Sequence, residues 1–139
     1  IGFSGDGAFG IAVTELTAIG RGEWPAVTMI VFRNYQWGAE KRNSTLWYED
    51  NFVGTELDTQ VSYAGIAQAC GLQGVQAHTM DDLRDALNRA VEDQMKHGKT
   101  TLIEAMINQE LGEPFRRDAM KKPVAVAGIS ASDMRPQTV

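Results

Sequence analysis

The sequence contains a single cysteine, and no apolar run in it approaches the roughly 18 residues needed to span a bilayer. Cys70 cannot form an internal disulfide. Its neighbours Ala67, Ala69 and Leu72 on an expected helix indicate a buried, unreactive thiol. Positive charge is also scarce, because 13 lysines and arginines face 18 aspartates and glutamates, for a formal net charge of -5. This balance argues against a nucleic-acid or membrane-surface partner.

The start of the chain shows neither an initiator methionine nor a charged leader before an apolar core. Because the sequence has no such leader and no apolar run long enough to span a bilayer, we expect a cytoplasmic protein. Because Ile1 already lies near the end of an expected strand, we also expect a fragment whose N-terminal strands are missing. The 139 residues are 43% hydrophobic, which is enough to bury the core of one domain. No internal repeat or linker indicates a second domain.

Alternating helix and strand patterns predict an α/β fold. After Gly7, apolar residues recur at helical spacing until Gly20, which predicts a first helix starting near Ala8. The next apolar run is short and rich in β-branched residues, as in a strand covered on both faces. The expected strands cover residues 26–32, 75–77 and 102–107, and the further helices cover residues 61–70 and a segment capped by Thr79 and stopped by Gly98. This alternation predicts a parallel sheet with helices on both faces.

Residues 35–60 interrupt the alternation, because no period holds there. Long loops in compact domains are usually functional or disordered, and the aromatic residues of this segment argue against disorder. We interpret the segment as a cover over an active site. Trp37 and Trp47 are better explained as loop anchors than as substrate-stacking residues. His78 and His97 lie at element ends among polar neighbours, which is typical of surface histidines.

An acidic residue and an amide follow two successive strands. Asp6 stands between Gly5 and Gly7 after the first expected strand, and Asn34 follows the next one. Ligands of parallel sheets bind outside the carboxyl ends of the strands, and the amide groups of a helix starting near Ala8 favour a phosphate there. Magnesium prefers octahedral oxygen ligation by a few protein groups and phosphate oxygens. The pattern predicts a joint site for magnesium and a diphosphate.

The Gly5-Asp6-Gly7 motif with Asn34 resembles the diphosphate domain of the acetolactate synthase and pyruvate decarboxylase superfamily of thiamine diphosphate enzymes. Two loop segments, residues 34–41 (NYQWGAEK) and 110–119 (ELGEPFRRDA), are similar to the sulfoacetaldehyde acetyltransferase family within it. The resemblance implies a thiamine diphosphate-binding fold over residues 1–123, followed by a tail over 124–139.

The resemblance also implies a set of site residues. Asp6 and Asn34 would be magnesium ligands, with the backbone carbonyl of Gln36 as the third. The implied cofactor-binding residues are Gly5, Asp6, Gly7, Ala8, Asn34, Gln36, Trp37 and Gly38. No catalytic residue is expected in this chain, because the glutamate that activates the cofactor lies in a separate pyrimidine domain in the family. A lone copy of the fragment is expected to be inactive.

The implied reaction converts sulfoacetaldehyde and phosphate into acetyl phosphate and sulfite. Both substrates are anions, so Lys41, Arg116 and Arg117 are candidate substrate-binding residues, with solvated surface charge as the alternative. The family resemblance implies a homodimer or homotetramer with the active site between subunits. Two other functions stay open: another thiamine diphosphate-dependent carboligase or decarboxylase such as acetolactate synthase, and a non-catalytic cofactor-binding module.

Overall fold

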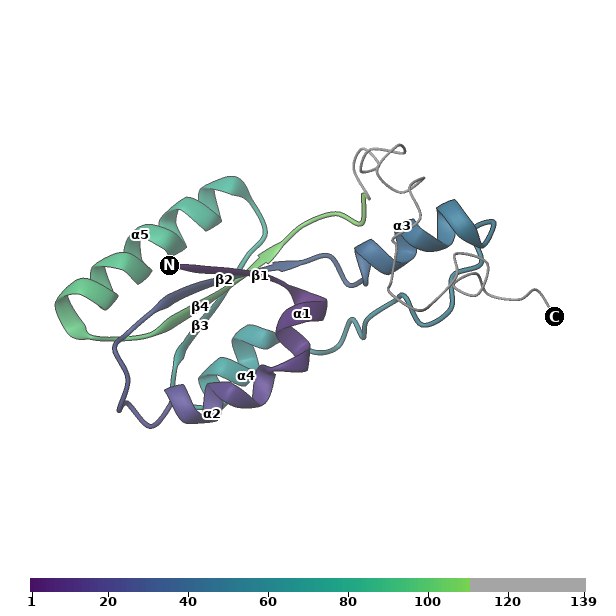
Figure 1. Ribbon diagram of the computed structural model, residues 1–139. Coiled ribbons are helices and arrows are strands. Elements are labelled where there is room, and N and C mark those ends of the chain that lie inside the picture. The colour runs from purple at the N-terminus through teal and green to yellow at the C-terminus, as the bar shows by residue number, and fades with distance from the viewer. Residues whose placement is uncertain (111–139) are drawn as a thin grey trace, which may run out of the picture.

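The computed structural model describes residues 1–110, apart from the side chain of Leu46, and contains a four-stranded parallel sheet in the order β1-β2-β4-β3 (Figure 1). The strands are β1 (Gly2–Gly5), β2 (Thr28–Arg33), β3 (Gln73–Ala77) and β4 (Thr101–Met106). Every pairing in the sheet is parallel, which confirms the predicted fold class. The predictions at Arg116, Arg117 and the tail lie outside the described residues.

Helices cover both faces of the sheet, as predicted (Figure 1). On one face lie α1 (Asp6–Ile11), the 3-10 turn η1 (Val13–Glu15), α2 (Leu16–Ile19) and α4 (Tyr63–Ala69). The opposite face is covered by α5 (Met80–His97), which is the longest helix of the described part. No helix within residues 1–110 is long and apolar enough to cross a membrane.

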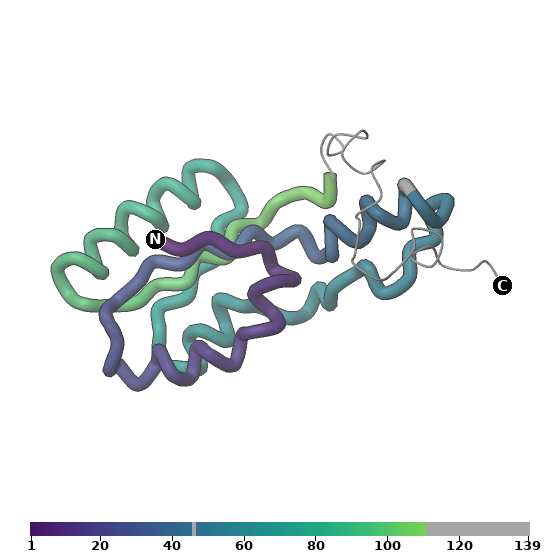
Figure 2. The backbone as a smooth tube through the Cα atoms, viewed as in Figure 1, coloured from purple at the N-terminus to yellow at the C-terminus, as the bar shows by residue number. Residues whose placement is uncertain are grey.

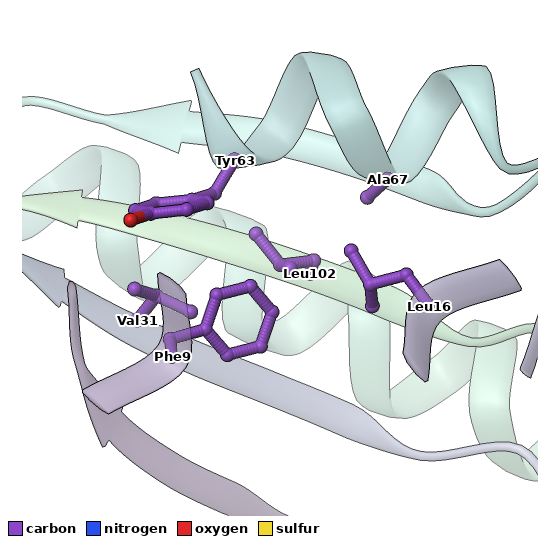
Figure 3. Close-up of a cluster of buried hydrophobic side chains, with 6 residues drawn as sticks. All are labelled: Phe9, Leu16, Val31, Tyr63, Ala67 and Leu102. Carbon is purple, nitrogen blue, oxygen red and sulfur yellow. The ribbon is translucent and has the colours of Figure 1, made fainter. Parts of the chain in front are cut away.

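The core has two halves, one on each side of the sheet. Between the sheet and the helices α1, α2 and α4, a cluster of buried side chains comprises Phe9, Leu16, Val31, Tyr63, Ala67 and Leu102 (Figure 3). Cys70 packs against this cluster and is half-buried, in agreement with a structural thiol. Under α5, the second cluster comprises Ile30, Ala77, Ala86, Ala90, Ile103 and Ala105. Burial on both faces explains why the sequences of β2 and β4 are nearly continuous apolar runs.

The ends of α5 follow the sequence signals. The Thr79 hydroxyl accepts a hydrogen bond from the Asp82 amide, and the Asp82 carboxylate accepts one from the Thr79 amide, which completes a capping box. These bonds, with one from the His78 amide, hold the pKa of Asp82 below its ordinary value. Gly98 ends the helix in the left-handed region at φ 61°. The predicted cap and stop are therefore both confirmed.

The first predicted helix differs from the structure. It starts at Asp6 rather than near Ala8, and it is broken at Ala12, whose φ of -112° lies outside the helical region. Gly10 and the β-branched pair Val13 and Thr14 are weak helix formers, so the propensity of this stretch does not sustain one helix. The apolar periodicity survives the break because Phe9 and Leu16 still reach the same core cluster.

The prediction of an irregular segment over residues 35–60 was wrong in part, because α3 spans Gly38–Trp47. Its sequence is dominated by polar residues between Glu40 and Thr45, so it has no apolar stripe for periodicity to detect. Figure 1 shows α3 beyond the carboxyl end of β2, away from the sheet. A helix that packs on no large core needs no such stripe.

The close contact between β3 and α4 gives a stability prediction. A Cβ atom at Gly74 would lie 2.1 Å from the carbonyl oxygen of Ala64, so Gly74→Ala forces two backbone segments apart. We expect a loss of about 1–3 kcal/mol in the free energy of unfolding, measured by urea denaturation. The matched control is Gly65→Ala inside α4, where the new Cβ meets only Ser62 atoms at 3.5 Å. Equal stability of the two variants would contradict the packing described here.

Candidate functional site at the carboxyl ends of β1 and β2

The two predicted ligand residues lie at neighbouring strand ends. In the register of β1 and β2, Gly5 is opposite Phe32, so the residues that follow each strand emerge side by side. The Asn34 amide donates to Asp6 Oδ2 at 3.1 Å. The structure therefore brings Asp6 and Asn34 together at the edge of the sheet where the sequence places a ligand site.

The Asp6 carboxylate is 2% exposed and accepts four hydrogen bonds within residues 1–110. Oδ2 accepts from the amides of Asn34 and Tyr35, at 3.1 and 2.7 Å, and from Arg33 Nη1 at 3.1 Å. Among residues 1–110, Oδ1 accepts only from the Gly7 amide, at 2.9 Å. A carboxylate has about four lone-pair sites, so Oδ1 keeps acceptor capacity that the described residues do not fill.

A left-handed residue shapes the turn after β2. Tyr35 has a φ of 60°, a conformation that costs a non-glycine residue on the order of 1–3 kcal/mol and is typical of functional sites. The turn directs the amides of Asn34 and Tyr35 at Asp6, and the Gln36 amide at Asn34 Oδ1, 3.2 Å away. The Gln36 side chain is 2% exposed, and its Oε1 has no hydrogen-bond partner among residues 1–110.

Arg33, the last residue of β2, lies between two buried carboxylates. Its Nη1 is 3.1 Å from Asp6 Oδ2, and its Nε is 3.5 Å from Glu104 Oε1. The guanidinium carbon also lies 4.2 Å from the ring centre of Tyr35 and 4.9 Å from that of Tyr63. Burial raises the pKa of the Tyr63 phenol, against the opposing effect of Arg33. The neutral phenol donates to the Asp6 carbonyl oxygen at 3.1 Å.

The glycines of the motif differ in their surroundings. A Cβ at Gly7 would lie 2.9 to 3.2 Å from the Trp37 ring, so only glycine allows the indole to lie this close. Nothing within 4 Å would meet a Cβ at Gly5, which is exposed, as is Ala8. Trp37 precedes Gly38, the first residue of α3. The cofactor contacts at these positions stay predictions.

Of the predicted substrate-binding cations, only Lys41 is within the described residues. Its ammonium forms an ion pair with Glu56 and lies 5.3 Å from the ring centre of Phe52. The hydrogen bond from Lys41 is the main reason that the pKa of Glu56 is below its ordinary value. This pair links α3 to residues 48–62, which Figure 2 shows running back from the end of α3 toward α4. A role for Lys41 in substrate binding stays a prediction.

The histidines take no part in the site. His78 and His97 are both exposed at the two ends of α5, as the sequence predicts. Within residues 1–110, no three side chains of histidine, cysteine, aspartate or glutamate converge on one point. The candidate metal ligands at the strand ends instead combine one carboxylate with amide and carbonyl oxygens.

Sequence reasoning missed Arg33 and Glu104. Each is a charged residue within or at the end of an otherwise apolar strand: Arg33 follows Met29-Ile30-Val31-Phe32, and Glu104 follows Leu102-Ile103. A charge in a strand buried on both faces must be paired, because an isolated buried charge costs several kcal/mol. That rule was the available signal, and it indicates that the two residues are partners.

Comparison with known proteins matches residues 1–105 to the family described as thiamine pyrophosphate enzyme, C-terminal TPP binding domain. The chain is 82% identical over 139 residues to the sulfoacetaldehyde acetyltransferase of Roseovarius nubinhibens, covering 100% of this chain and 23% of the relative. It is 66% identical over 137 residues to a probable sulfoacetaldehyde acetyltransferase of Rhizobium meliloti, covering 99% and 23%. The chain thus spans about a quarter of the length of these curated relatives.

Solved structures show the same architecture. The benzoylformate decarboxylase of Polynucleobacter necessarius superposes with a TM-score of 0.66 at 23% identity, over 81% of this chain and 20% of that one. A thiamine diphosphate-dependent 4-hydroxybenzoylformate decarboxylase of Rhodococcus jostii RHA1 gives a TM-score of 0.66 at 22% identity, over 79% and 20%. At these identities the likeness shows the fold alone, and it confirms the predicted α/β architecture.

The ion pair between Lys41 and Glu56 predicts local ordering of residues 35–60. Removing the charge with Glu56→Gln should speed hydrogen exchange at neutral pH for the Trp37 and Leu57 amides, which donate to Thr55 and Tyr35 carbonyls at 2.8 Å. In the unaltered protein, the pair contributes stability above the ordinary glutamate pKa, and this is lost as the pH falls through the lowered pKa of Glu56.

Glu92→Gln is the matched control for this measurement, because Glu92 forms an exposed pair with Lys96 on α5. We expect it to leave exchange in residues 35–60 unchanged. Equal protection in the Glu56→Gln and unaltered proteins would show that the pair does not order the segment.

Proposed function

Because the chain belongs to the family of thiamine pyrophosphate enzyme C-terminal TPP-binding domains, we propose that it is the cofactor-binding part of a sulfoacetaldehyde acetyltransferase. In this proposal the full-length enzyme converts sulfoacetaldehyde and phosphate into acetyl phosphate and sulfite. The observation that carries it is the 82% identity to a named enzyme along all of this chain. The names of the curated relatives favour this activity over an acetolactate synthase and over a non-catalytic module.

The site supports magnesium as the cation that accompanies the diphosphate. Asp6 Oδ1, Asn34 Oδ1 and the backbone carbonyl of Gln36 are hard oxygen ligands of the kind that magnesium prefers. Each side-chain oxygen accepts one hydrogen bond within the described chain, from Gly7 and Gln36 respectively, so a further lone pair is left on each. The Gln36 Oε1, which has no hydrogen-bond partner among residues 1–110, adds a buried acceptor next to these ligands in the sequence.

The charge of the site also fits a cation. Asp6, Arg33 and Glu104 are each at most 2% exposed, and two carboxylates with one guanidinium leave a formal charge of -1 among the three. An uncompensated buried charge is costly, and a divalent cation at Asp6 would offset it. The residues present therefore fit a magnesium ion, which Asp6, Asn34 and the Gln36 carbonyl would hold.

When bound, thiamine diphosphate supplies a carbanion that can add to the aldehyde carbonyl of the substrate. The residues of this chain bind and orient the cofactor through its diphosphate end. Asp6 and Asn34 are held at neighbouring strand ends by the backbone, so their spacing is set by the sheet rather than by flexible loops. Such preorganisation lowers the entropic cost of binding. The predicted contacts at Gly5, Gly7, Ala8, Trp37 and Gly38 belong to the same proposal.

The proposal extends to the assembly and location of the full-length protein. We place it in the cytoplasm as a homodimer or homotetramer with the active site between subunits. Exposed apolar side chains on residues 35–60, namely Trp47, Tyr48, Phe52 and Val53, support a contact with another part of the assembled enzyme.

The metal site predicts that Asp6→Ala abolishes cofactor retention. Calorimetric titration of the full-length protein with thiamine diphosphate and magnesium should give no binding heat at concentrations that saturate the unaltered protein, because the only carboxylate among the proposed ligands is gone. Asp81→Asn is the control, since Asp81 is exposed on α5 and pairs with Arg84. Unchanged binding by the Asp6→Ala variant would remove the central claim.

The substrate prediction concerns Arg116 and Arg117, which lie outside the described residues. A guanidinium matches the oxygens of sulfonate or phosphate, and hydrogen bonds to charged groups are worth about 1.5–3 kcal/mol. At about 1.4 kcal/mol per decade, replacing both with methionine should raise the Michaelis constant for phosphate or sulfoacetaldehyde at least tenfold. Thiamine diphosphate affinity should stay the same, as should both constants in the control Arg84→Met. Unchanged Michaelis constants for both substrates in the double variant would show that the two arginines do not bind substrate.

A further inference from the structure

The Arg33 side chain connects four separate parts of the fold. Its Nη2 donates to the carbonyl oxygens of Asp58 at 2.5 Å and Val61 at 3.1 Å, while Nη1 and Nε face Asp6 and Glu104. Only 1% of the side chain is exposed. A solvated surface charge would have none of these contacts. The guanidinium therefore has a defined orientation that its partners impose from several sides.

The contact with Arg33 fixes how Asp6 is oriented. Three donors, Arg33 Nη1 and the amides of Asn34 and Tyr35, converge on Oδ2. Because Oδ2 is saturated, the carboxylate cannot rotate without breaking several buried hydrogen bonds, and Oδ1 is left as the oxygen with free acceptor capacity. Without Arg33, the two backbone amides alone would hold Oδ2, and the carboxylate would be freer to turn.

Glu104 in turn holds Arg33. Its Oε2 accepts from Ser62 Oγ at 3.0 Å, from the Ala64 amide at 3.2 Å and from Gln76 Nε2 at 3.0 Å. Its Oε1 has no hydrogen-bond partner among residues 1–110, but it forms an ion pair with Arg33 Nε at 3.5 Å. Glu104 is thus immobilised by α4 and β3, and its second oxygen is directed at the guanidinium.

These contacts balance charge as well as geometry. One guanidinium is shared by two buried carboxylates, so Asp6 is only partly neutralised by it. If Glu104 were uncharged, the whole guanidinium charge would act on Asp6 and would repel a cation at Oδ1. Glu104 therefore favours cation binding at a carboxylate that it does not itself contact.

We propose that Arg33, held by Glu104, is a positioning residue that fixes the Asp6 carboxylate with Oδ1 presented to the divalent cation. The inference rests on the proposed function, because it assigns a role around the same cation site. It adds two residues that no sequence motif indicates. It also gives a reason for keeping three charges in a sheet interior, where apolar residues of similar volume are often more stable.

The test uses the full-length protein and the dissociation constant of magnesium at saturating thiamine diphosphate, measured by calorimetry at 25 °C. Arg33→Lys keeps the positive charge but loses the planar guanidinium, whose several donors join Asp6 to the Asp58 and Val61 carbonyls. We expect the dissociation constant of magnesium to rise at least tenfold. Glu104→Gln keeps the size and the acceptor for Ser62, and we expect a rise of at least threefold.

Matched controls are Arg89→Lys and Glu92→Gln, which make the same chemical changes at exposed positions of α5. Neither should change the magnesium constant. Calorimetric unfolding of the cofactor-free variants separates positioning from stability: a purely structural role would lower the unfolding temperature and leave the magnesium constant unchanged, and that result would overturn the inference.

If Arg33→Lys does not fold, Glu104→Gln is the deciding variant. An unchanged dissociation constant of magnesium in Glu104→Gln overturns the inference. Failure of the unaltered protein to bind magnesium with thiamine diphosphate would instead refute the proposed function. The two failures are therefore distinguishable. Tight binding by the unaltered protein with equal binding by both variants refutes only the positioning role.

Discussion

The arrangement of the site depends on three buried charges near the carboxyl ends of β1, β2 and β4. Asp6, Arg33 and Glu104 come from three different elements, and each is nearly inaccessible to solvent. Breaking one buried ion pair by removing a partner typically costs about 3–5 kcal/mol. The strand order, the turn after β2 and the start of α4 must therefore all be correct before the charges can be satisfied. The same three residues leave Asp6 Oδ1 with a lone pair that can bind a cation.

The sheet supplies the geometry that the chemistry needs. Parallel pairing of β1 with β2 brings Asp6 beside Asn34, and the left-handed Tyr35 turns the following backbone toward the same carboxylate. The core cluster under α1, α2 and α4 also includes Tyr63 (Figure 3), whose phenol donates a hydrogen bond to the Asp6 carbonyl oxygen. Tyr63 thus belongs both to the core and to the polar site. The strain at Tyr35 is offset by three hydrogen bonds that the amides of Asn34, Tyr35 and Gln36 donate.

The sequence was sufficient to predict the sheet, the presence of helices on both its faces and the meeting of Asp6 with Asn34, because hydrophobic periodicity and strand-end position carry that information. It did not predict α3, whose stability does not depend on an apolar stripe, or the break at Ala12, where propensity overrides periodicity. Arg33 and Glu104 were missed because a motif search selects residues at turns. Their pairing depends on which strands are neighbours, and β2 and β4 are far apart in the sequence.

The most direct test of the central claim is a crystal structure of the full-length protein with magnesium and thiamine diphosphate. The account predicts that Asp6 Oδ1, Asn34 Oδ1 and the Gln36 carbonyl oxygen each lie about 2.0–2.1 Å from the metal, with diphosphate oxygens among the remaining ligands. It also predicts that Arg33 stays on Asp6 Oδ2. A metal held elsewhere, or one that contacts Asp6 through Oδ2 with Arg33 displaced, would contradict the account.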